Sequence, residues 1–267
     1  MKDNLVKATR KVLPKSAVGA LEKGYRKSRV KLVSARYGNP AKDLRVLAIT
    51  GTNGKTTTAC YLNEILKEAG KKTAMFTTAL IEIDGDKKLN DKNATVALTA
   101  EMQAFFKEAK EAAVDFVIIE VTSHALDQHK LDGVPIEAAI MTNLTQDHLD
   151  YHHTMENYAA AKAKLFSKNP KIVVLNHDDK WFEYFDEIGT PGEKMTYGTN
   201  KEAETRITGV KLYKKGSEVS LEIDHQNNLD LATSLPGKYN VYNLTAAATL
   251  AYLLHVDLGS IREGVAN

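Results

Sequence analysis

The sequence holds very little cysteine, with Cys60 as the one thiol among 267 residues. A single thiol excludes a framework of intramolecular disulfides and a zinc site made from cysteines alone, and it is typical of a reducing compartment. Long apolar runs are lacking as well, since no stretch approaches the roughly 18 apolar residues of a membrane-spanning helix and no signal-peptide core follows the start. These absences together predict a cytoplasmic protein.

Net charge is also small, but it is unevenly distributed. The chain has 36 Lys and Arg residues against 34 Asp and Glu residues, a formal charge of +2. Residues 1–45 hold 13 of the basic and 3 of the acidic residues, so this segment carries +10 and the rest of the chain −8. The segment is interpreted as a solvated, partly helical arm, or as a surface for an anionic membrane leaflet or a phosphorylated substrate. The membrane alternative would make the protein membrane-peripheral. Nucleic acid is not expected as a partner, because aromatic residues are not interleaved with the basic ones.

From about residue 44, short apolar runs alternate with helical patterns. The predicted strands are 44–50, 72–77, 115–121, 138–144 and 171–176, and the predicted helices are 56–69, 99–113, 155–166 and 235–254. This alternation indicates an α/β fold with a mostly parallel sheet that helices cover on both faces. Near residues 204–235, two β-rich runs separated by Lys214-Lys215-Gly216 predict a small hairpin-like β-rich insert.

The strongest local pattern is Thr50-Gly51-Thr52-Asn53-Gly54-Lys55-Thr56-Thr57, between a predicted strand and a predicted helix. Glycines let the backbone wrap closely around a phosphate so that several N–H groups point at it, and the start of the helix adds a favourable field. Lys55 is expected to reach the outer phosphates, and the Thr56 hydroxyl to bind Mg²⁺. Ile49 takes the place of the first glycine of the general motif. The pattern predicts nucleotide binding against the alternative of a chance turn.

Three further features provide candidate metal ligands. Glu120 lies at the end of the predicted strand 115–121, so its carboxylate should emerge at the edge of the sheet where ligands bind. Five of the eight histidines lie between positions 124 and 153, and His148 sits in the densest part. Such histidines can be metal ligands, catalytic bases or polar loop residues. Lys162, among small residues of a predicted helix, is by itself an ordinary helical lysine.

Six motifs follow one another in a characteristic order and spacing. They are GTNGKTT (51–57), EVTSHALDQHK (120–130), TNLTQDHLDYH (142–152), YAAAK (158–162), NHDD (176–179) and GKYNVYNLTAAA (237–248). With these motifs the chain resembles the central ATP-binding domain of the Mur ligases, and most closely the MurE type, which adds the third amino acid to the peptidoglycan precursor. The resemblance extends over about residues 44–265 and implies a fold like that of the P-loop NTPases.

The resemblance implies a nucleotide and metal site. Thr56 and Glu120 would bind one Mg²⁺, and His148 would bind a second together with Lys162. In this family the equivalent lysine is carbamylated by CO₂, which turns a cation into a metal-binding anion and replaces the ordinary interpretation of Lys162. Asn240 would contact adenine. The ATP phosphates would be held by Gly51, Thr52, Asn53, Gly54, Lys55, Thr56 and Thr57.

The resemblance also implies a substrate and a reaction. Thr122, Gln128 and Lys130 match positions that hold the UDP-MurNAc-peptide, and Asn93 and Thr95 match a further substrate motif. Thr122 stands where the family commonly has serine, and Lys130 where it has arginine, which replaces a two-pronged donor by a point charge. In the implied reaction the peptide carboxylate takes the γ-phosphoryl group of ATP, and an amino acid then displaces phosphate to form an amide bond. Catalytic roles would fall to Lys55, Glu120, His148 and Lys162.

Length sets the expected domain organisation. Residues 1–45 are expected to be a basic N-terminal segment, 46–256 the central ATP-binding domain, and 257–267 the start of a linker to an absent C-terminal domain. The isolated chain is therefore expected to bind Mg·ATP and to be a poor ligase alone. Two alternatives stay open. One is another ligase of the superfamily, such as a folylpolyglutamate or cyanophycin synthetase, and the other is a nucleotide-binding subunit that needs a partner.

Overall fold

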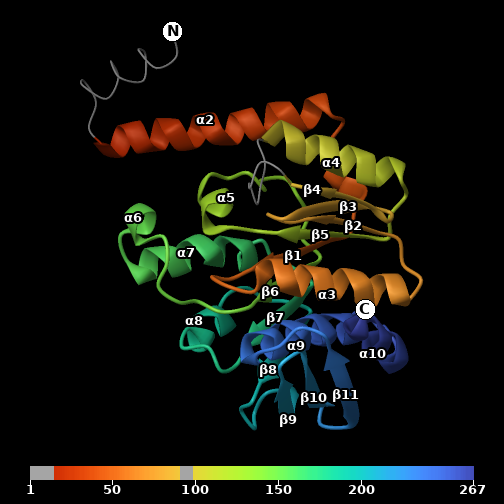
Figure 1. The fold of residues 1–267 in the computed structure, drawn as a ribbon. Coiled ribbons are helices and arrows are strands. Elements are labelled where there is room, and N and C mark those ends of the chain that lie inside the picture. The colour runs from red at the N-terminus through yellow and green to blue at the C-terminus, as the bar shows by residue number, and fades with distance from the viewer. Residues whose placement is uncertain (1–14, 91–98) are drawn as a thin grey trace.

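The computed structural model describes residues 15–90 and 99–267, and the strands within these residues form one sheet. The sheet has eleven strands in the order β11-β10-β9-β8-β7-β6-β1-β5-β2-β3-β4 (Figure 1). Neighbours from β2 to β9 in this order pair in parallel. The predicted α/β fold with a mostly parallel sheet is confirmed. The parallel strands besides β9 are β1 (Val46–Thr50), β2 (Thr73–Phe76), β5 (Phe116–Glu120), β6 (Ala138–Met141), β7 (Ile172–Asn176) and β8 (Glu193–Gly198).

Helices cover both faces of the sheet, which explains why its central strands are continuous apolar runs. The side chains of Leu47 and Ile49 pack on one face and those of Val46 and Ala48 on the other. On the first face lie α3 (Lys55–Glu68), α9 (Lys238–Leu253) and α10 (Leu258–Ala266). On the second face lie α4 (Thr99–Glu111), α5 (Ser123–Asp127), α7 (Met155–Phe166) and α8 (Phe182–Asp186).

Antiparallel strands extend the sheet at both edges. One edge is the hairpin of β3 (Leu80–Ile83) and β4 (Asp86–Leu89). The other contains β9 (Thr205–Tyr213), β10 (Gly216–Ile223) and β11 (Asn227–Thr233), so the predicted hairpin-like insert is confirmed and gains a third strand. The sequence pattern missed β4 because all four of its residues are exposed, which leaves no apolar signal.

The two ends of the described chain are helical. Helix α2 (Lys15–Arg36) belongs to the basic segment and lies alongside α4, where Val30 is buried (Figure 1). A short 3₁₀ turn, η1 (Pro40–Asp43), leads from it into β1. Residues 257–267, whose role as the start of a linker stays a prediction, contain α10, which packs against α3 and β11. Over residues 15–90 and 99–267, no helix combines the length and the apolar character that a membrane crossing requires.

Candidate active site

The predicted phosphate loop connects β1 to α3 and requires its two glycines. The backbone of Gly51 has φ of 148° and that of Gly54 has φ of 86°, values that favour glycine. A Cβ atom at Gly51 would also overlap the Thr142 hydroxyl, and one at Gly54 would overlap the Asn243 side-chain amide. The glycines therefore allow both the turn and the close approach of two neighbouring segments.

The loop after β6 holds the phosphate loop in shape. Thr52 N donates to Asn143 O at 2.8 Å, and Asn53 N donates to Asn143 Oδ1 at 3.0 Å. In return, the Thr142 hydroxyl donates to Asn53 O at 2.7 Å. The predicted strand 138–144 thus ends early, at Met141, because the next residues bond to the phosphate loop. This segment was predicted to reach the site but not to support the loop.

Lys55 and Glu120 lie together at the carboxyl edge of the sheet. The register of β1 and β5 sets Ile49 opposite Glu120, so the carboxylate emerges directly beside the phosphate loop. Lys55 Nζ donates to Thr52 O at 2.8 Å and lies 3.8 Å from Glu120 Oε1. Burial lowers the pKa of Lys55, and the Glu120 carboxylate opposes this shift. The lysine is thus desolvated and close to the place where nucleotide phosphates would lie.

The Glu120 carboxylate also accepts hydrogen bonds from hydroxyl groups that could serve as ligands for a hard cation. Its Oε2 atom accepts from the Thr56 hydroxyl at 2.7 Å and from the Thr78 hydroxyl and backbone N–H at 2.8 and 3.1 Å. Hydroxyl and carboxylate oxygens are metal ligands that Mg²⁺ prefers. Thr56 and Glu120 therefore fit the predicted ion, whose remaining ligands would be phosphate oxygens and water. Sequence reasoning missed Thr78, which carries no motif and follows β2 by two residues.

Lys162 is one of the most deeply buried side chains, with 1% of its surface exposed. Its Nζ atom donates to Gly51 O at 2.7 Å and lies 4.6 Å from the centre of the Tyr158 ring. Burial lowers the pKa of Lys162 well below its ordinary value, and the nearby Lys55 lowers it further. The environment thus favours the neutral amine.

His148 lies at the start of the short helix α6 (Leu149–His152), in a left-handed conformation with φ of 52°. Its ring centre is 6.3 Å from that of Tyr158, so His148 and Lys162 both adjoin the Tyr158 ring. His148 Nε2 lies 3.5 Å from Asp147 Oδ2. Among the side chains of residues 15–90 and 99–267 that the structure describes, His, Cys, Asp and Glu do not gather in threes as a metal site.

A polar contact connects α6 to α5. His152 Nε2 lies 2.9 Å from the Ser123 hydroxyl, and both side chains are buried. The His152 ring also packs against His124 and Tyr158, with ring centres 5.6 and 5.1 Å apart. Burial lowers the pKa of His152, and the neighbouring His124 lowers it further. The histidine-rich stretch thus connects the helix of Lys162 to the segment that begins at Thr122.

A cleft of about 830 Å³ opens on the other side of the phosphate loop. Tyr239, exposed over 84% of its surface, stands at this cleft beside Lys238 at the start of α9. Asn240 does not line the cleft itself but contacts Asn243, which does. Its Oδ1 atom accepts from Asn243 Nδ2 at 3.3 Å, and its own amide donates to Pro236 O at 2.9 Å. The cleft is lined by Asn53, Gly54, Asn143, Thr145, Asn176, Asp178, Asp179, Lys238, Tyr239, Tyr242 and Asn243.

Asp178 and Tyr242 form a polar pair in this cleft. The Tyr242 hydroxyl donates to Asp178 Oδ2 at 2.6 Å, and burial together with this bond raises the pKa of Tyr242 to about 12. The same carboxylate accepts from Thr199 and from the backbone of Asn200. Sequence reasoning gave these residues no role, although the NHDD and GKYNVYN motifs that contain Asp178 and Tyr242 were visible.

The predicted substrate residues lie on the α5 side of the loop. The Thr122 hydroxyl accepts from Ala125 N at 3.2 Å and so caps α5, while Gln128 ends that helix. Lys130 follows, and burial together with Arg29 of α2 lowers its pKa. Asn93 and Thr95 lie outside the described residues, so their predicted role stays a prediction.

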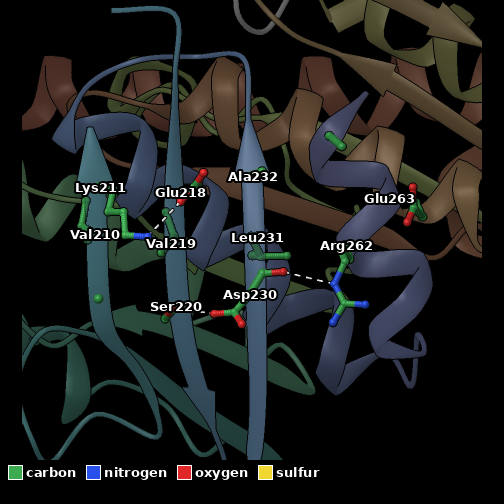
Figure 2. Close-up of a pocket in the computed structure, with 12 residues that line it drawn as sticks. Val210, Lys211, Glu218, Val219, Ser220, Asp230, Leu231, Ala232, Arg262 and Glu263 are labelled. Atoms are coloured by element: carbon green, nitrogen blue, oxygen red, sulfur yellow. Dashed lines mark hydrogen bonds and ion pairs between the residues drawn. The ribbon is translucent and has the colours of Figure 1, made fainter. Parts of the chain in front are cut away.

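A further cleft of about 640 Å³ lies between strands β9–β11 and helix α10 (Figure 2). Arg262 Nε donates to Asp230 O at 3.2 Å across it, and Ser220 donates to the Asp230 carboxylate at 2.6 Å. The side chains that line it come from β9, β10, β11 and α10, and the predicted catalytic residues come from other elements. This cleft is therefore separate from the phosphate loop.

Comparison with known proteins gives this arrangement a family. The Mur ligase middle domain matches residues 49–251. A UDP-N-acetylmuramoyl-L-alanyl-D-glutamate–2,6-diaminopimelate ligase of Bacillus velezensis is 40% identical over 225 residues, which cover 81% of this chain and 45% of that protein. UDP-N-acetylmuramyl-tripeptide synthetase 2 of Oceanobacillus iheyensis is 37% identical, with 83% and 46% covered. The chain thus spans about half the length of the curated relatives it matches.

Comparison with solved structures supports the same family. A UDP-N-acetylmuramoyl-L-alanyl-D-glutamate–2,6-diaminopimelate ligase superposes with a TM-score of 0.75 at 31% identity, with 83% of this chain and 46% of that chain covered. Folylpolyglutamate synthase of Mycobacterium tuberculosis has a TM-score of 0.72 at 18% identity, with 90% and 62% covered, which shows a shared fold alone.

Proposed function

Because the chain belongs to the Mur ligase family, we propose that it carries the ATP-dependent, acyl-activating core of a ligase that forms amide bonds in peptidoglycan precursor synthesis. The observation that carries this proposal is the joint arrangement of Lys55, Thr56 and Glu120 beside the buried amine of Lys162. A simple nucleotide-binding module has no need of a desolvated lysine behind its phosphate loop, whereas a metal-assisted ligase does.

ATP is proposed to bind across the two sides of the phosphate loop. Its phosphates would lie on the N–H groups at the start of α3, next to Lys55 and the Thr56 hydroxyl. Its adenosine would occupy the 830 Å³ cleft, between Asn243 and the exposed ring of Tyr239. Asn240, predicted to contact adenine, would act there by orienting Asn243. Mg²⁺ would supply charge neutralisation for the phosphate oxygens.

Lys162 is proposed to become a metal ligand through carbamylation. The neutral amine nitrogen that burial favours would attack the carbon of CO₂, form an N–C bond and release a proton. The product is a carbamate anion, so the site no longer has to bury an ammonium group. The buried anion would in turn be stabilised by a cation as its partner. His148, beside the same Tyr158 ring, would share the second Mg²⁺.

The proposed chemistry has two steps. A carboxylate oxygen of a UDP-MurNAc-peptide attacks the γ-phosphorus of ATP, and the bond to ADP breaks to leave an acyl phosphate. The amino group of an amino acid then attacks the acyl carbon, loses a proton and expels phosphate. Thr122, Gln128 and Lys130, with Asn93 and Thr95, are proposed to hold the peptide substrate, so that positioning and charge stabilisation supply the rate enhancement.

The division of labour along the chain is part of the proposal. Residues 46–256 would perform the nucleotide chemistry, residues 1–45 would meet an anionic partner, and residues 257–267 would lead toward a further domain. The anionic partner of residues 1–45 is either a membrane surface or the phosphorylated precursor. Binding of the added amino acid is assigned to a part of the protein outside these ranges, so its identity is left open.

Mass spectrometry of the intact chain, with and without ¹³C-bicarbonate, tests the proposal. We expect a labelled carboxyl increment on Lys162 that Lys162→Met removes, together with Mg²⁺-dependent binding of ATP. Tight ATP binding without any increment, and with ATP turnover unchanged in Lys162→Met, would contradict the ligase and favour a nucleotide-binding subunit.

A further inference from the structure

A small cavity of about 240 Å³ lies where helix α2 passes over the segments that follow α5 and α7. It joins three parts of the chain that are far apart in the sequence, and one of them is the basic N-terminal segment. Helix α2 lies alongside α4 (Figure 1), and α4, α5 and α7 pack on the same face of the sheet. The cavity is lined by Lys27, Leu126, His129, Leu131, Asp132, Lys164, Ser167 and Lys168.

Cations outnumber anions in this lining. Three lysines face one aspartate, and that aspartate is already shared, since Asp132 lies 3.2 Å from His129 Nδ1 and 4.0 Å from Lys168 Nζ. Lys164 is paired with Asp127 at 2.6 Å, but Asp127 also accepts from a tyrosine hydroxyl. The carboxylates of the described residues around the cavity therefore balance only part of the positive charge.

Burial and the excess of positive charge lower the pKa values of groups that line the cavity. Burial lowers the pKa of His129, and Lys27 and Lys164 lower it further, against the opposing effect of Asp132. Burial also lowers the pKa of Lys168, whose side chain is only 23% exposed. These cations are thus crowded and partly desolvated, and an anion between them would relieve both costs.

The position of the cavity indicates which kind of anion would bind there. It adjoins the end of the segment 122–130, because Leu126 and His129 of that segment line it. We propose that Lys27, Lys164 and Lys168 form a binding site for the diphosphate group of the substrate that receives the amino acid. This inference rests on the proposed function, which supplies a precursor linked through a diphosphate. It assigns the basic helix α2 to substrate binding.

Two sources share this chemistry, a nucleotide-linked and a lipid-linked diphosphate. Both present oxygens that lysine ammonium groups bind as point charges. A flat anionic membrane is a different partner, and the inward position of Lys168 and His129 favours a small group that enters the cavity over a surface that lies against α2.

The test follows His129 in the full chain by NMR while inorganic pyrophosphate is added. Because a bound anion offsets the effect of Lys27 and Lys164, we expect the pKa of His129 to rise on binding. The local signal also separates this site from any pyrophosphate on the phosphate loop. We expect Lys27→Ala to raise the dissociation constant read from His129 by about fivefold at low salt.

Lys71→Ala provides the matched control, since Lys71 is an exposed lysine just after α3, which lies on the other face of the sheet from α5 and α7. It should leave the dissociation constant unchanged. A His129 signal that ignores pyrophosphate would overturn the proposal, and so would equal weakening by Lys27→Ala and Lys71→Ala, which would indicate bulk charge only. A result in which Lys27→Ala weakens co-sedimentation with phosphatidylglycerol vesicles but not pyrophosphate binding would also overturn it, in favour of a membrane surface.

UDP and farnesyl diphosphate then distinguish the two sources, and tighter binding of either one than of pyrophosphate supports the site. ATP turnover measured on the same samples keeps this inference apart from the proposed function. A normal pyrophosphate response with no ATP binding would contradict the proposed function alone. Normal ATP binding with no response at His129 would contradict the diphosphate site alone.

Discussion

The two sides of the phosphate loop are built differently. On the side of Glu120 and Lys162 the functional side chains are buried, and each is already bonded to a neighbour: Glu120 to Thr56 and Thr78, and Lys162 to Gly51 O. On the side of the 830 Å³ cleft, Tyr239 is exposed over 84% of its surface and Lys238 is exposed as well. The side chains of the first side are already held by hydrogen bonds without a ligand. Those of the second side are exposed and available to contact a ligand.

This difference matches the demands of the two tasks that the proposed function assigns to these sides, phosphoryl transfer and nucleoside recognition. Charge stabilisation during phosphoryl transfer requires fixed groups in a site of low polarity, because groups that must reorganise lose most of their effect. Recognition of a nucleoside tolerates side chains that order on binding. Substitutions on the buried side should therefore change the rate, and those on the open side should change affinity.

Glu120→Gln should have the largest effect. The amide removes the negative charge that a metal ion needs, and its N–H group would face the Thr56 and Thr78 donors. We expect ATP turnover to fall by about three orders of magnitude, with ATP affinity changed far less, in steady-state assays and equilibrium binding. Glu137→Gln, at the opposite edge of the sheet beside Arg45, is the matched control. An equal loss in both variants would contradict a local role.

Lys162→Met should separate rate from stability. We expect ATP turnover to fall by about two orders of magnitude while the melting temperature rises. Because burial lowers the pKa of Lys162, the folded chain holds a proton there less tightly than the unfolded chain does. Lys162 thus lowers the free energy of unfolding fully at pH values below its folded pKa, and this loss fades as the pH rises to the ordinary value near 10.5.

The gain in stability should accordingly shrink as the pH rises toward the ordinary pKa of lysine. Thermal unfolding of both proteins across this pH range measures it, without bicarbonate so that the amine is unmodified. A gain that grows with pH would contradict the burial argument. Lys164→Met, whose Nζ lies 2.6 Å from Asp127 in a more exposed position, is the control and should not raise stability.

The sequence predicted the buried side better than the open one. Gly51–Thr57 follow one short apolar strand and Glu120 ends another, so the end of each strand fixes where these residues emerge. The 830 Å³ cleft joins Asn143, Asp178 and Tyr242 from three separate segments, and only the packing of α9 onto the sheet brings them together. Composition also hid Lys162, because its helical pattern is ordinary and its burial results from contact with the phosphate loop.

The same limit applies to the edges of the fold. The basic segment was visible as charge, but its place over α5 and α7 depends on contacts between α2 and distant parts of the chain. Helix α10, within residues 257–267 that were expected to start a linker, was not predicted from the sequence pattern. Its apolar residues Ile261 and Val265 are buried in the core with α3 and α9, which gives them a partner that the local sequence does not reveal.

Tyr242→Phe tests the open side. The change removes the hydroxyl that donates to Asp178 at 2.6 Å and leaves the ring in place. Because the carboxylate loses one of its donors at the wall of the cleft, we expect the dissociation constant for ATP to rise about fivefold with little change in maximal turnover. Tyr252→Phe is the matched control on the same helix, since its hydroxyl bonds to Asn227 outside the cleft. A fall in turnover at saturating ATP would show that the two sides are not separate in function.

His153→Gly should have the smallest effect, and it tests whether the buried side stores backbone strain. His153 follows α6 with φ of 69° and ψ of −40°, a conformation that a side chain disfavours, and its own side chain is exposed. Glycine removes this cost of roughly 1–2 kcal/mol but loses more entropy on folding, so we expect a net gain of about 1 kcal/mol and a melting temperature about 2–4 °C higher. His255→Gly, at φ of 62° between α9 and α10, should stabilise the fold in the same way without touching the site. If the strain at His153 helps to orient His148, only His153→Gly will lower ATP turnover, whereas equal turnover in both variants would show that the strain is incidental.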